Sequence, residues 1–267
     1  SGTIEKVVYP ENIEQLIKLL QYLKDNKIKY MVVGNGSNLI FVGDYNGVII
    51  KLDALNSLEI DGHIVKVGAG YNLMKLALKT VNRGLQGLEF ASGIPATVGG
   101  AVYMNAGAYK SQMSNVLKEV IVINDRLELQ TLTNEELGFA YRTSILQKTK
   151  WICVQATLEL EDGNKEELLE IIKDRKLRRV DAQPLEYPSA GSVFRNPEGD
   201  YAGRLVESLG LKGKHVGGAF VSDKHANFIV SDGTATGKDI KQLIEEVRKE
   251  VFDKYGIELI VEQEFVE

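Results

Sequence analysis

Apolar residues recur every three or four positions in several segments, a pattern that predicts amphipathic helices. The segments are residues 11–26, 71–84, 164–179 and 240–252. Gly84 stands where the second of these helices should end, since glycine readily adopts the left-handed conformation that closes a helix. The helical pattern therefore covers both halves of the chain.

Shorter apolar runs between these segments predict strands. Residues 30–33 follow the first helix, residues 47–52 follow a glycine-rich turn, and residues 149–163 form a longer run. Two further pairs of runs are joined by Asp61-Gly62 and by Asn124-Asp125, and such dipeptides favour hairpin turns. Because strands occur singly and in hairpins as well as beside helices, we expect an α+β fold rather than a regular alternation of strands and helices.

Prolines concentrate in one stretch, residues 180–201, which holds three of the five in the chain. A proline-rich segment of this length is typical of a domain boundary or of a loop that carries a site. After this stretch, the last third of the chain contains a new series of apolar segments. It ends in residues 258–267, ELIVEQEFVE, which we expect to form a terminal strand.

The composition is that of a globular protein: of 267 residues, 44% are hydrophobic and 26% are charged. The net charge of −5 excludes broad electrostatic attraction to nucleic acid, so we expect no nucleic-acid partner. No apolar run is long enough to span a membrane and the start lacks the features of a signal peptide, which favours a cytoplasmic protein without a membrane partner. The single cysteine, Cys153, excludes an internal disulfide, and we expect it to be a buried strand residue. We expect no metal site.

The common nucleotide-binding motifs are absent. VGNGSNL and VGAGYNL both contain G-x-G, but Leu39 and Leu73 stand where a dinucleotide-binding helix needs a small residue. GTATGKD resembles a phosphate-binding loop but has Asp239 in place of Ser or Thr. The sequence therefore predicts neither a Rossmann nor a P-loop site.

Two glycine-rich segments remain. Residues 34–38 can curl their N–H groups round an anion, but taken alone this loop is more simply explained as an ordinary tight turn between strands. Residues 87–109 are small and almost uncharged, which suits a backbone that passes close to a flat ligand. Tight packing beneath another element is an equally good explanation, and composition leaves both open.

Several long motifs occur in an order that resembles the UDP-N-acetylenolpyruvoylglucosamine reductases of type II, flavoproteins with a vanillyl-alcohol-oxidase-like FAD domain. The motifs are GNGSNL, GLEFASGIPATVGGAVYMNAGAY, AYRTSIL, PSAGSVFRNP, AGRLVESLGLKGKHVGGAFVSDKHANFIV and LIVEQ. They span nearly the whole chain. The resemblance implies an α+β fold with a two-part FAD-binding domain, residues 1–52 and 53–181, and a smaller substrate domain, residues 182–267. The last strand is expected to return to the first subdomain.

The resemblance further implies an enzyme that uses non-covalent FAD and NADPH to reduce UDP-N-acetylglucosamine enolpyruvate to UDP-N-acetylmuramate for peptidoglycan. The flavin is expected to be non-covalent because neither FAD-contacting segment contains a histidine. We expect a monomer. The implied FAD contacts are Gly34, Asn35, Gly36, Ser37, Asn38, Leu39, Ser92, Gly93, Ile94, Pro95, Thr97, Gly99, Gly100, Asn105 and Gly107.

Three catalytic positions carry over from the family: Arg142, Ser192 and Glu262. Arg142 is expected to bind the substrate carboxylate, Ser192 to donate a proton, and Glu262 to help polarise the carboxylate. Taken singly, Arg142 is more typical of a surface ion pair, Ser192 of a turn residue, and Glu262 of a solvated carboxylate at the end of a strand. Only their motif context favours catalysis.

The implied substrate contacts are Tyr141, Asn196, Lys224, His225 and Asn227. Lysines and arginines within residues 173–179 would suit a diphosphate, and a solvated helix end explains them equally well. The chain also departs from the family in having Gln263 where Val is common and in having only ten residues before the first predicted helix, where members usually have some tens.

Two other functions compete with a reductase: a related FAD oxidase acting on another hydroxy acid or sugar, and a non-catalytic binder of flavin or UDP-sugar. PSAGSVFRNP and KHANFIV favour the reductase over the oxidase. Retention of all three catalytic residues argues against the binder.

Overall fold

Two units make up the chain in the computed structural model, which describes residues 2–267. Unit 2 comprises Lys6–Asn35 and Gly47–Leu177. Unit 1 comprises the residues up to Glu5, Gly36–Asn46 and Arg178–Glu267. Each unit is therefore assembled from segments that are distant in the sequence.

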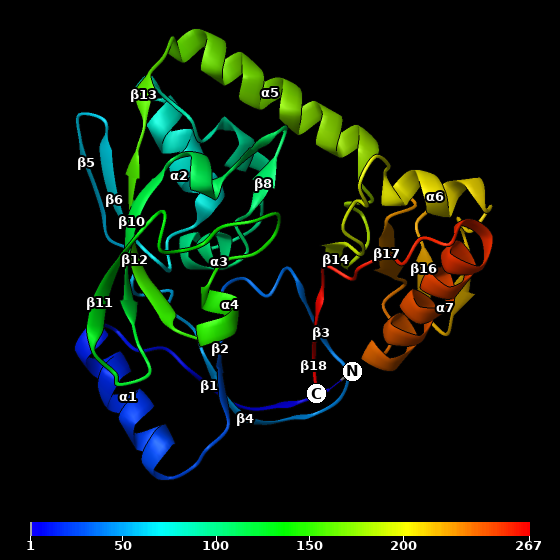
Figure 1. The fold of residues 1–267 in the computed structure, drawn as a ribbon, viewed down its shortest axis with the longest axis horizontal. Helices are drawn as coiled ribbons and strands as arrows, with labels where there is room; N and C mark the ends of the chain where they lie inside the picture. Colours follow the sequence, from blue (N-terminus) through cyan, green and yellow to red (C-terminus); the bar gives the residue numbers. More distant parts are fainter. Residues whose placement is uncertain (1) are drawn as a thin grey trace. The chain divides into compact units, whose positions relative to one another are not determined.

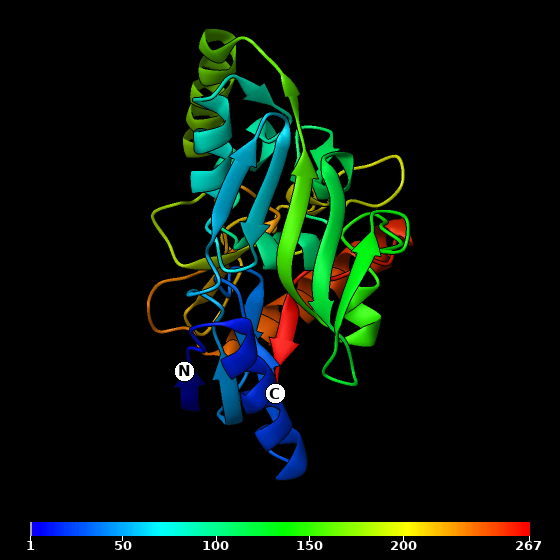
Figure 2. The same cartoon turned by 90° about the vertical axis from the view of Figure 1, so that its left-hand side faces the viewer.

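The centre of unit 2 is a five-stranded antiparallel sheet with the order β11-β10-β12-β6-β5, whose strands are seen side by side in Figure 2. Its strands are β5 (Leu58–Asp61), β6 (Ile64–Gly68), β10 (Leu117–Ile123), β11 (Leu129–Thr133) and β12 (Ile152–Glu159). Both predicted hairpins are confirmed: β5 pairs with β6 across Gly62, and β10 pairs with β11. Gly62 has a φ of +53°, which a β-carbon would disfavour.

A three-stranded sheet, β1-β4-β2, consists of β1 (Ile4–Val8), β4 (Tyr45–Ile50) and β2 (Tyr30–Val32). Two short antiparallel pairs join β7 (Leu85–Gln86) to β13 (Glu161–Asp162) and β8 (Gly107–Ala108) to β9 (Ser111–Gln112). The helices are α1 (Ile13–Asp25), α2 (Leu73–Val81), η1 (Glu89–Gly93), α3 (Val98–Tyr103), η2 (Met113–Asn115), α4 (Leu146–Thr149) and α5 (Lys165–Ala182). The last of these crosses from unit 2 into unit 1 at residue 178.

The core of unit 2 forms where the apolar faces of its helices meet the central sheet. Val65, Val67, Val120 and Ala156 of the sheet and Leu76 of α2 are fully buried in one cluster. Cys153 of β12 joins this cluster, which confirms that it is a buried strand residue. Burial raises the pKa of its thiol to about 12, because a thiolate is poorly solvated there.

Unit 1 is built on a four-stranded antiparallel sheet, β14-β17-β16-β15, with α6 and α7 beside it (Figure 1). Its elements are β14 (Ser189–Ser192), α6 (Ala202–Ser208), β15 (His215–Val216), β16 (Ala219–Val221), β17 (Phe228–Ser231) and α7 (Gly237–Tyr255). The strand β18 (Glu264–Val266) pairs in parallel with β3 (Leu39–Phe41). Leu243, Ile244, Val247 and Val251 of α7 are buried, as its helical pattern predicts.

The α+β fold predicted from the sequence is confirmed, with two local differences. Residues 87–109 include the short helices η1 and α3, although small residues such as these are not typical of a core helix. The terminal segment 258–267 forms a strand only at Glu264–Val266. The three-part division at residues 52 and 181 stays a prediction. Across residues 2–267, no helix combines the length and the apolar character that crossing a bilayer requires.

Candidate active site

Two of the segments expected to contact FAD meet in unit 2. The Asn35 side-chain Nδ2 donates a hydrogen bond to the Pro95 carbonyl at 3.1 Å. A β-carbon added at Gly34 would lie 2.6 Å from Thr97 Oγ1, so only glycine allows this approach. Thr97 in turn caps α3, where its Oγ1 accepts from the Gly100 N–H. The glycine-rich loop therefore lies directly against the start of α3.

Internal packing explains several glycines of this region. A β-carbon at Gly99 would lie 2.9 Å from Ala69 Cβ, and the Gly99 N–H donates to the Ala69 carbonyl. A β-carbon at Gly107 would lie 2.5 Å from the Ser111 carbonyl oxygen. Of the two explanations that the composition of residues 87–109 left open, close packing against neighbouring residues therefore accounts for Gly99 and Gly107.

The same segments also fit an FAD molecule. Residues 34–35 and 92–100 carry no charged side chain, and Ser92, Gly93, Ile94 and Gly100 remain partly exposed. An uncharged, partly exposed backbone can offer N–H donors to a diphosphate without repelling it and without blocking a flat ring. The chemistry of these residues suits FAD.

Arg142, in unit 2, contacts the C-terminal end of the glycine-rich segment 87–109. Its Nη2 donates to the Gly107 carbonyl at 2.8 Å, and its guanidinium carbon lies 5.0 Å from the centre of the exposed Tyr141 ring. The residue has a φ of +58°, in a tight turn closed by the bridge between Ala140 and Thr143. This left-handed conformation costs a non-glycine residue roughly 1–2 kcal/mol, so the surrounding contacts must hold it in place.

Asn105 supplies one of those contacts. It is completely buried and donates from Nδ2 to the Ala140 carbonyl at 3.0 Å, while its Oδ1 accepts from the Ser114 N–H at 3.0 Å. Asn105 was expected to contact FAD, but both ends of its amide are used inside unit 2. Its assignment as a cofactor contact stays a prediction.

Ser192 and Glu262 lie on neighbouring backbone segments in unit 1. The Glu262 N–H donates to the Val193 carbonyl at 2.8 Å, and the Arg195 N–H donates to the Ile260 carbonyl at 2.9 Å. These two bonds flank the antiparallel bridge between Phe194 and Val261. Both side chains are half-buried. The structure therefore places the backbones of Ser192 and Glu262 on adjacent paired segments of unit 1 and ties Arg142 to the expected cofactor segment in unit 2.

Asn38, another predicted FAD contact, holds the backbone next to Glu262. Its Nδ2 donates to the Glu262 carbonyl at 3.0 Å, and its own carbonyl accepts from the Glu264 N–H at 2.9 Å. Leu39 continues this contact as the first paired residue of β3, opposite Glu264. Residues 36–39 thus belong to unit 1, whereas Gly34 and Asn35 belong to unit 2.

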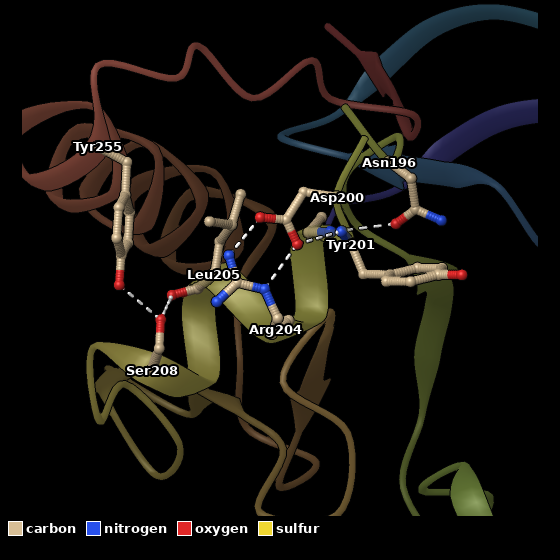
Figure 3. Close-up of polar contacts among 8 residues, drawn as sticks. Asn196, Asp200, Tyr201, Arg204, Leu205, Ser208 and Tyr255 are labelled. Atoms are coloured by element: carbon tan, nitrogen blue, oxygen red, sulfur yellow. Dashed lines mark hydrogen bonds and ion pairs between the residues drawn. The ribbon is translucent and has the colours of Figure 1, made fainter. Parts of the chain in front are cut away.

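The predicted substrate residues of unit 1 have different surroundings. Asn227 is buried, with its amide hydrogen-bonded to Phe194. The Lys224 Nζ donates to the Val180 carbonyl at 2.6 Å. The Asn196 Oδ1 accepts from the Ala202 N–H at 3.1 Å and so helps to begin α6 (Figure 3). Substrate contact by these three residues stays a prediction.

The start of α6 is fixed by a second pair of groups. Asp200 pairs with Arg204 one turn later, and the Tyr201 N–H donates to the Asp200 carboxylate at 2.7 Å (Figure 3). These bonds, first of all the one from Arg204, lower the pKa of Asp200 to about 2. Asp200 therefore keeps its charge near neutral pH, and Tyr201 beside it is largely exposed.

His225 is half-buried in the segment that joins β16 to β17. Its Nδ1 accepts from the Asn227 N–H at 3.2 Å, and its ring centre lies 4.8 Å from that of Phe228. Burial lowers the pKa of His225, so the imidazole is neutral near neutral pH. A neutral ring can accept or donate one hydrogen bond but does not add a positive charge for a diphosphate.

Two contacts between distant residues could not be predicted from the sequence motifs. In unit 2 the Arg175 guanidinium carbon lies 4.6 Å from the centre of the Tyr109 ring. One arginine of residues 173–179 therefore makes a cation–π contact within the protein. In unit 1 the Gln263 side chain donates to the Gly191 carbonyl. Each joins residues far apart in the chain, and only the register of the folded chain shows which residues meet.

Two family models and several known reductases are similar to this chain. A model of the C-terminal domain of UDP-N-acetylenolpyruvoylglucosamine reductases matches residues 183–266, and a model of an FAD-binding domain matches residues 4–132. The UDP-N-acetylenolpyruvoylglucosamine reductase of Anoxybacillus flavithermus is 47% identical over 268 residues, covering 99% of this chain and 89% of its own. The reductase of Bacillus subtilis is 43% identical, with coverages of 99% and 88%.

A solved structure shows the same fold. The crystal structure of the UDP-N-acetylenolpyruvylglucosamine reductase of Thermus caldophilus matches with a TM-score of 0.85 and 36% identity, covering 98% of this chain and 92% of its own. The relatives and the solved structure thus match almost the entire chain, and the two family models match its first half and its last third. The chain belongs to the UDP-N-acetylenolpyruvoylglucosamine reductases and is an FAD-dependent oxidoreductase.

Proposed function

We propose that the protein uses NADPH to reduce the enolpyruvyl ether of UDP-N-acetylglucosamine enolpyruvate to the lactyl ether of UDP-N-acetylmuramate, a step of peptidoglycan precursor synthesis. The observation that carries this proposal is the pairing of residues 193–195 with residues 260–262, which holds Ser192 near Glu262. Reduction of this double bond needs a proton donor beside a group that handles a carboxylate. Unit 1 offers both.

The chemistry sets the requirements for the site. FAD, when bound, supplies the hydride that the terminal carbon of the enolpyruvyl group accepts. Negative charge then develops beside the substrate carboxylate, and the neighbouring carbon must take up a proton. The protein therefore has to bind the carboxylate, stabilise the developing charge and deliver one proton.

Arg142 is suited to bind the substrate carboxylate. Its guanidinium keeps its positive charge at all relevant pH values and has five N–H donors, one of which goes to the Gly107 carbonyl. The contact with Gly107 orients the planar group. A guanidinium oriented in this way can bind a carboxylate through two parallel hydrogen bonds.

Ser192 delivers the proton from its Oγ to the carbon next to the carboxylate. A serine hydroxyl is a weak acid, so the alkoxide left behind must be stabilised by neighbouring groups. Glu262 acts on the substrate carboxylate and polarises it by sharing a proton with it. The half-burial of both side chains supports this division of roles, because electrostatic effects are stronger away from bulk water.

The residues that would hold FAD are those of the two glycine-rich segments, with Thr97 capping α3 between them. Gly34, Asn35, Ser92, Gly93, Ile94, Pro95, Gly99 and Gly100 present the uncharged backbone described above, and Gly36, Ser37, Asn38 and Leu39 continue it in unit 1. The flavin is held without a covalent bond. We propose Tyr141, Asn196, Lys224, His225 and Asn227 as substrate contacts, and Asn105 and Gly107 as further FAD contacts.

The experiment follows NADPH oxidation in the presence of FAD, with and without UDP-N-acetylglucosamine enolpyruvate. The proposal expects oxidation to accelerate strongly when this substrate is present. In Ser192→Ala, reduction of the flavin by NADPH should continue while its reoxidation by the enolpyruvyl substrate slows. A flavin-loaded protein that is indifferent to the substrate would rule out the proposed reaction, and an unchanged rate in Ser192→Ala would rule out the serine as proton donor.

We also propose that the protein acts as a monomer in the cytoplasm, where its nucleotide substrates are made. The single cysteine, which leaves no internal disulfide to form, fits the reducing environment of the cytoplasm. Gel filtration with light scattering tests the monomer.

A further inference from the structure

Gln263 has an unusual environment for an amide side chain. It exposes only 5% of its surface, and its Nε2 donates to the Gly191 carbonyl at 3.0 Å. Its Oε1 is buried without a hydrogen-bond partner in the structure. An unpartnered buried amide oxygen destabilises a protein, so the presence of glutamine here has to be explained by what its Nε2 does.

The backbone around Gln263 changes partners at this residue. Up to Glu262 the chain pairs in antiparallel fashion with residues 193–195. From Glu264 onward it pairs in parallel with β3, because the Glu264 N–H donates to the Asn38 carbonyl. Gln263 is the single residue between the two pairings.

The antiparallel register places Gln263 opposite Ser192, since Phe194 faces Val261 and Val193 is bonded to Glu262. If this ladder continued, the Gly191 carbonyl would accept from the Glu264 N–H. That N–H is taken by Asn38. The Gln263 side chain supplies the missing donor instead.

Gly191 is a point where the backbone needs such support. Its φ is +76°, and the pairing of β14 with β17 is irregular between Ser189 and Ser192. The Gly191 carbonyl and the Ser192 nitrogen belong to one planar peptide unit. A hydrogen bond that fixes this carbonyl therefore also fixes the direction in which the Ser192 backbone, and with it the side chain, leaves the turn.

We propose that Gln263 is a positioning residue for the reaction: its Nε2 holds the Gly191–Ser192 peptide and so sets the Ser192 hydroxyl relative to Glu262. This inference rests on the proposed function, in which Ser192 donates the proton. It adds a residue outside the catalytic trio, one that acts through Ser192 and does not touch the substrate.

The test replaces Gln263 by methionine, which keeps the length of the side chain and removes both polar atoms. Gln242→Met is the matched control, because Gln242 is exposed on α7. We expect Gln263→Met to unfold at nearly the same temperature as the unmodified protein, since removal of the unpartnered Oε1 offsets loss of the bond to the Gly191 carbonyl. Reoxidation of reduced flavin by the enolpyruvyl substrate should slow by about 10-fold or more, because small displacements of a reacting group are costly in rate.

Other readouts separate positioning from a general structural effect. Reduction of the flavin by NADPH and the substrate KM should stay as in the control, so that the loss lies in kcat. In a Ser192→Ala background, Gln263→Met should cause no further loss, because its effect acts through the missing hydroxyl. Equal slowing of both half-reactions, or a loss that persists in the Ser192→Ala background, would overturn the proposal.

A crystal structure of Gln263→Met gives a readout that does not depend on activity. We expect the Gly191–Ser192 peptide to rotate away from its position in the unmodified protein. An unchanged peptide would overturn the proposal even if the proposed reaction is correct. Conversely, if the unmodified protein does not reduce the enolpyruvyl substrate, the proposed function fails, and the rotation still decides whether Gln263 holds this turn.

Discussion

Asn227 binds both polar groups of the Phe194 backbone: its Oδ1 accepts from the Phe194 N–H at 3.0 Å and its Nδ2 donates to the Phe194 carbonyl at 2.9 Å. In addition, the Asn227 carbonyl accepts from the Val193 N–H at 2.9 Å. One buried residue of the predicted substrate-binding motif therefore fixes the segment that follows Ser192. Its role is explained by local hydrogen bonding, with or without a substrate.

Replacing Asn227 by aspartate tests this role. The substitution puts an oxygen where Nδ2 faces the Phe194 carbonyl, so a buried donor is lost and two acceptors oppose each other. We expect the free energy of unfolding to fall by about 1–3 kcal/mol, measured by urea denaturation. Asn56→Asp is the matched control, because Asn56 makes one exposed bond to the Asp53 carbonyl. Similar losses in the two variants would contradict the structural role of Asn227.

Gly34→Ala should weaken FAD binding. The new β-carbon would lie 2.6 Å from Thr97 Oγ1, so the loop or the capping threonine must move. We expect a loss of stability of about 1–3 kcal/mol, as for other overpacked sites, together with a higher Kd for FAD from flavin fluorescence. Gly43→Ala is the control, since its β-carbon meets nothing within 4 Å. Unchanged FAD binding in Gly34→Ala would show that this loop is not part of the cofactor site.

Arg142→Lys keeps the positive charge but removes the planar group that contacts Gly107. We expect flavin reduction by NADPH to continue while reduction of the enolpyruvyl substrate slows by about 100-fold or more, as when a donor for developing negative charge is removed. Stopped-flow measurement of the two half-reactions separates these steps. Arg126→Lys, at an exposed position in the β10–β11 turn, controls for the change of residue type. A full rate with lysine would exclude two-point binding of the carboxylate.

The buried thiol of Cys153 predicts a dependence of stability on pH. Its pKa is raised to about 12 in the folded protein, whereas an unfolded thiol ionises near 8.5. Since the folded pKa is the higher one, the unfolded state alone releases the proton above about pH 8.5, and stability falls as the pH rises toward 12. The loss approaches about 1.4 kcal/mol for each pH unit in that range.

Urea denaturation at about pH 8 and pH 10 measures this effect, with Cys153→Ala as the reference that lacks the thiol. The unmodified protein should lose stability relative to the variant as the pH rises. A difference that stays constant with pH would show that Cys153 ionises in the folded state. Slow reaction of the native protein with a thiol-specific dye, and rapid reaction after denaturation, gives independent support.

Patterns within a short segment were sufficient to predict those helices and hairpins that are determined by neighbouring residues. The apolar spacing of residues 240–252 predicted α7, because one face of that helix packs on unit 1 and the other meets water. Asp61-Gly62 predicted the β5–β6 hairpin, because Gly62 can adopt the positive φ that the turn needs. Long motifs likewise identified the family and therefore the cofactor class.

The same patterns did not predict the conformation of two segments that is decided by contacts with distant residues. The apolar run 258–267 looks like one strand, but residues 260–262 pair with 193–195, and β18 pairs with β3. Residues 87–109 contain α3 although their composition is poor for a helix, because Thr97 caps it and its close neighbours demand small residues. In both cases, contacts across long sequence separations decide the conformation.

Periodicity, turn chemistry and motifs were enough to predict the fold class, the four longest helices, two hairpins, the family, and Arg142, Ser192 and Glu262 as candidate catalytic residues. The folded chain was needed to show that Asn38 and Asn227 hold backbone, that Arg142 is anchored to Gly107, and that Gln263 bonds to Gly191. A hydrogen bond between distant residues depends on strand register, and register is set by packing of the whole unit rather than by any local segment.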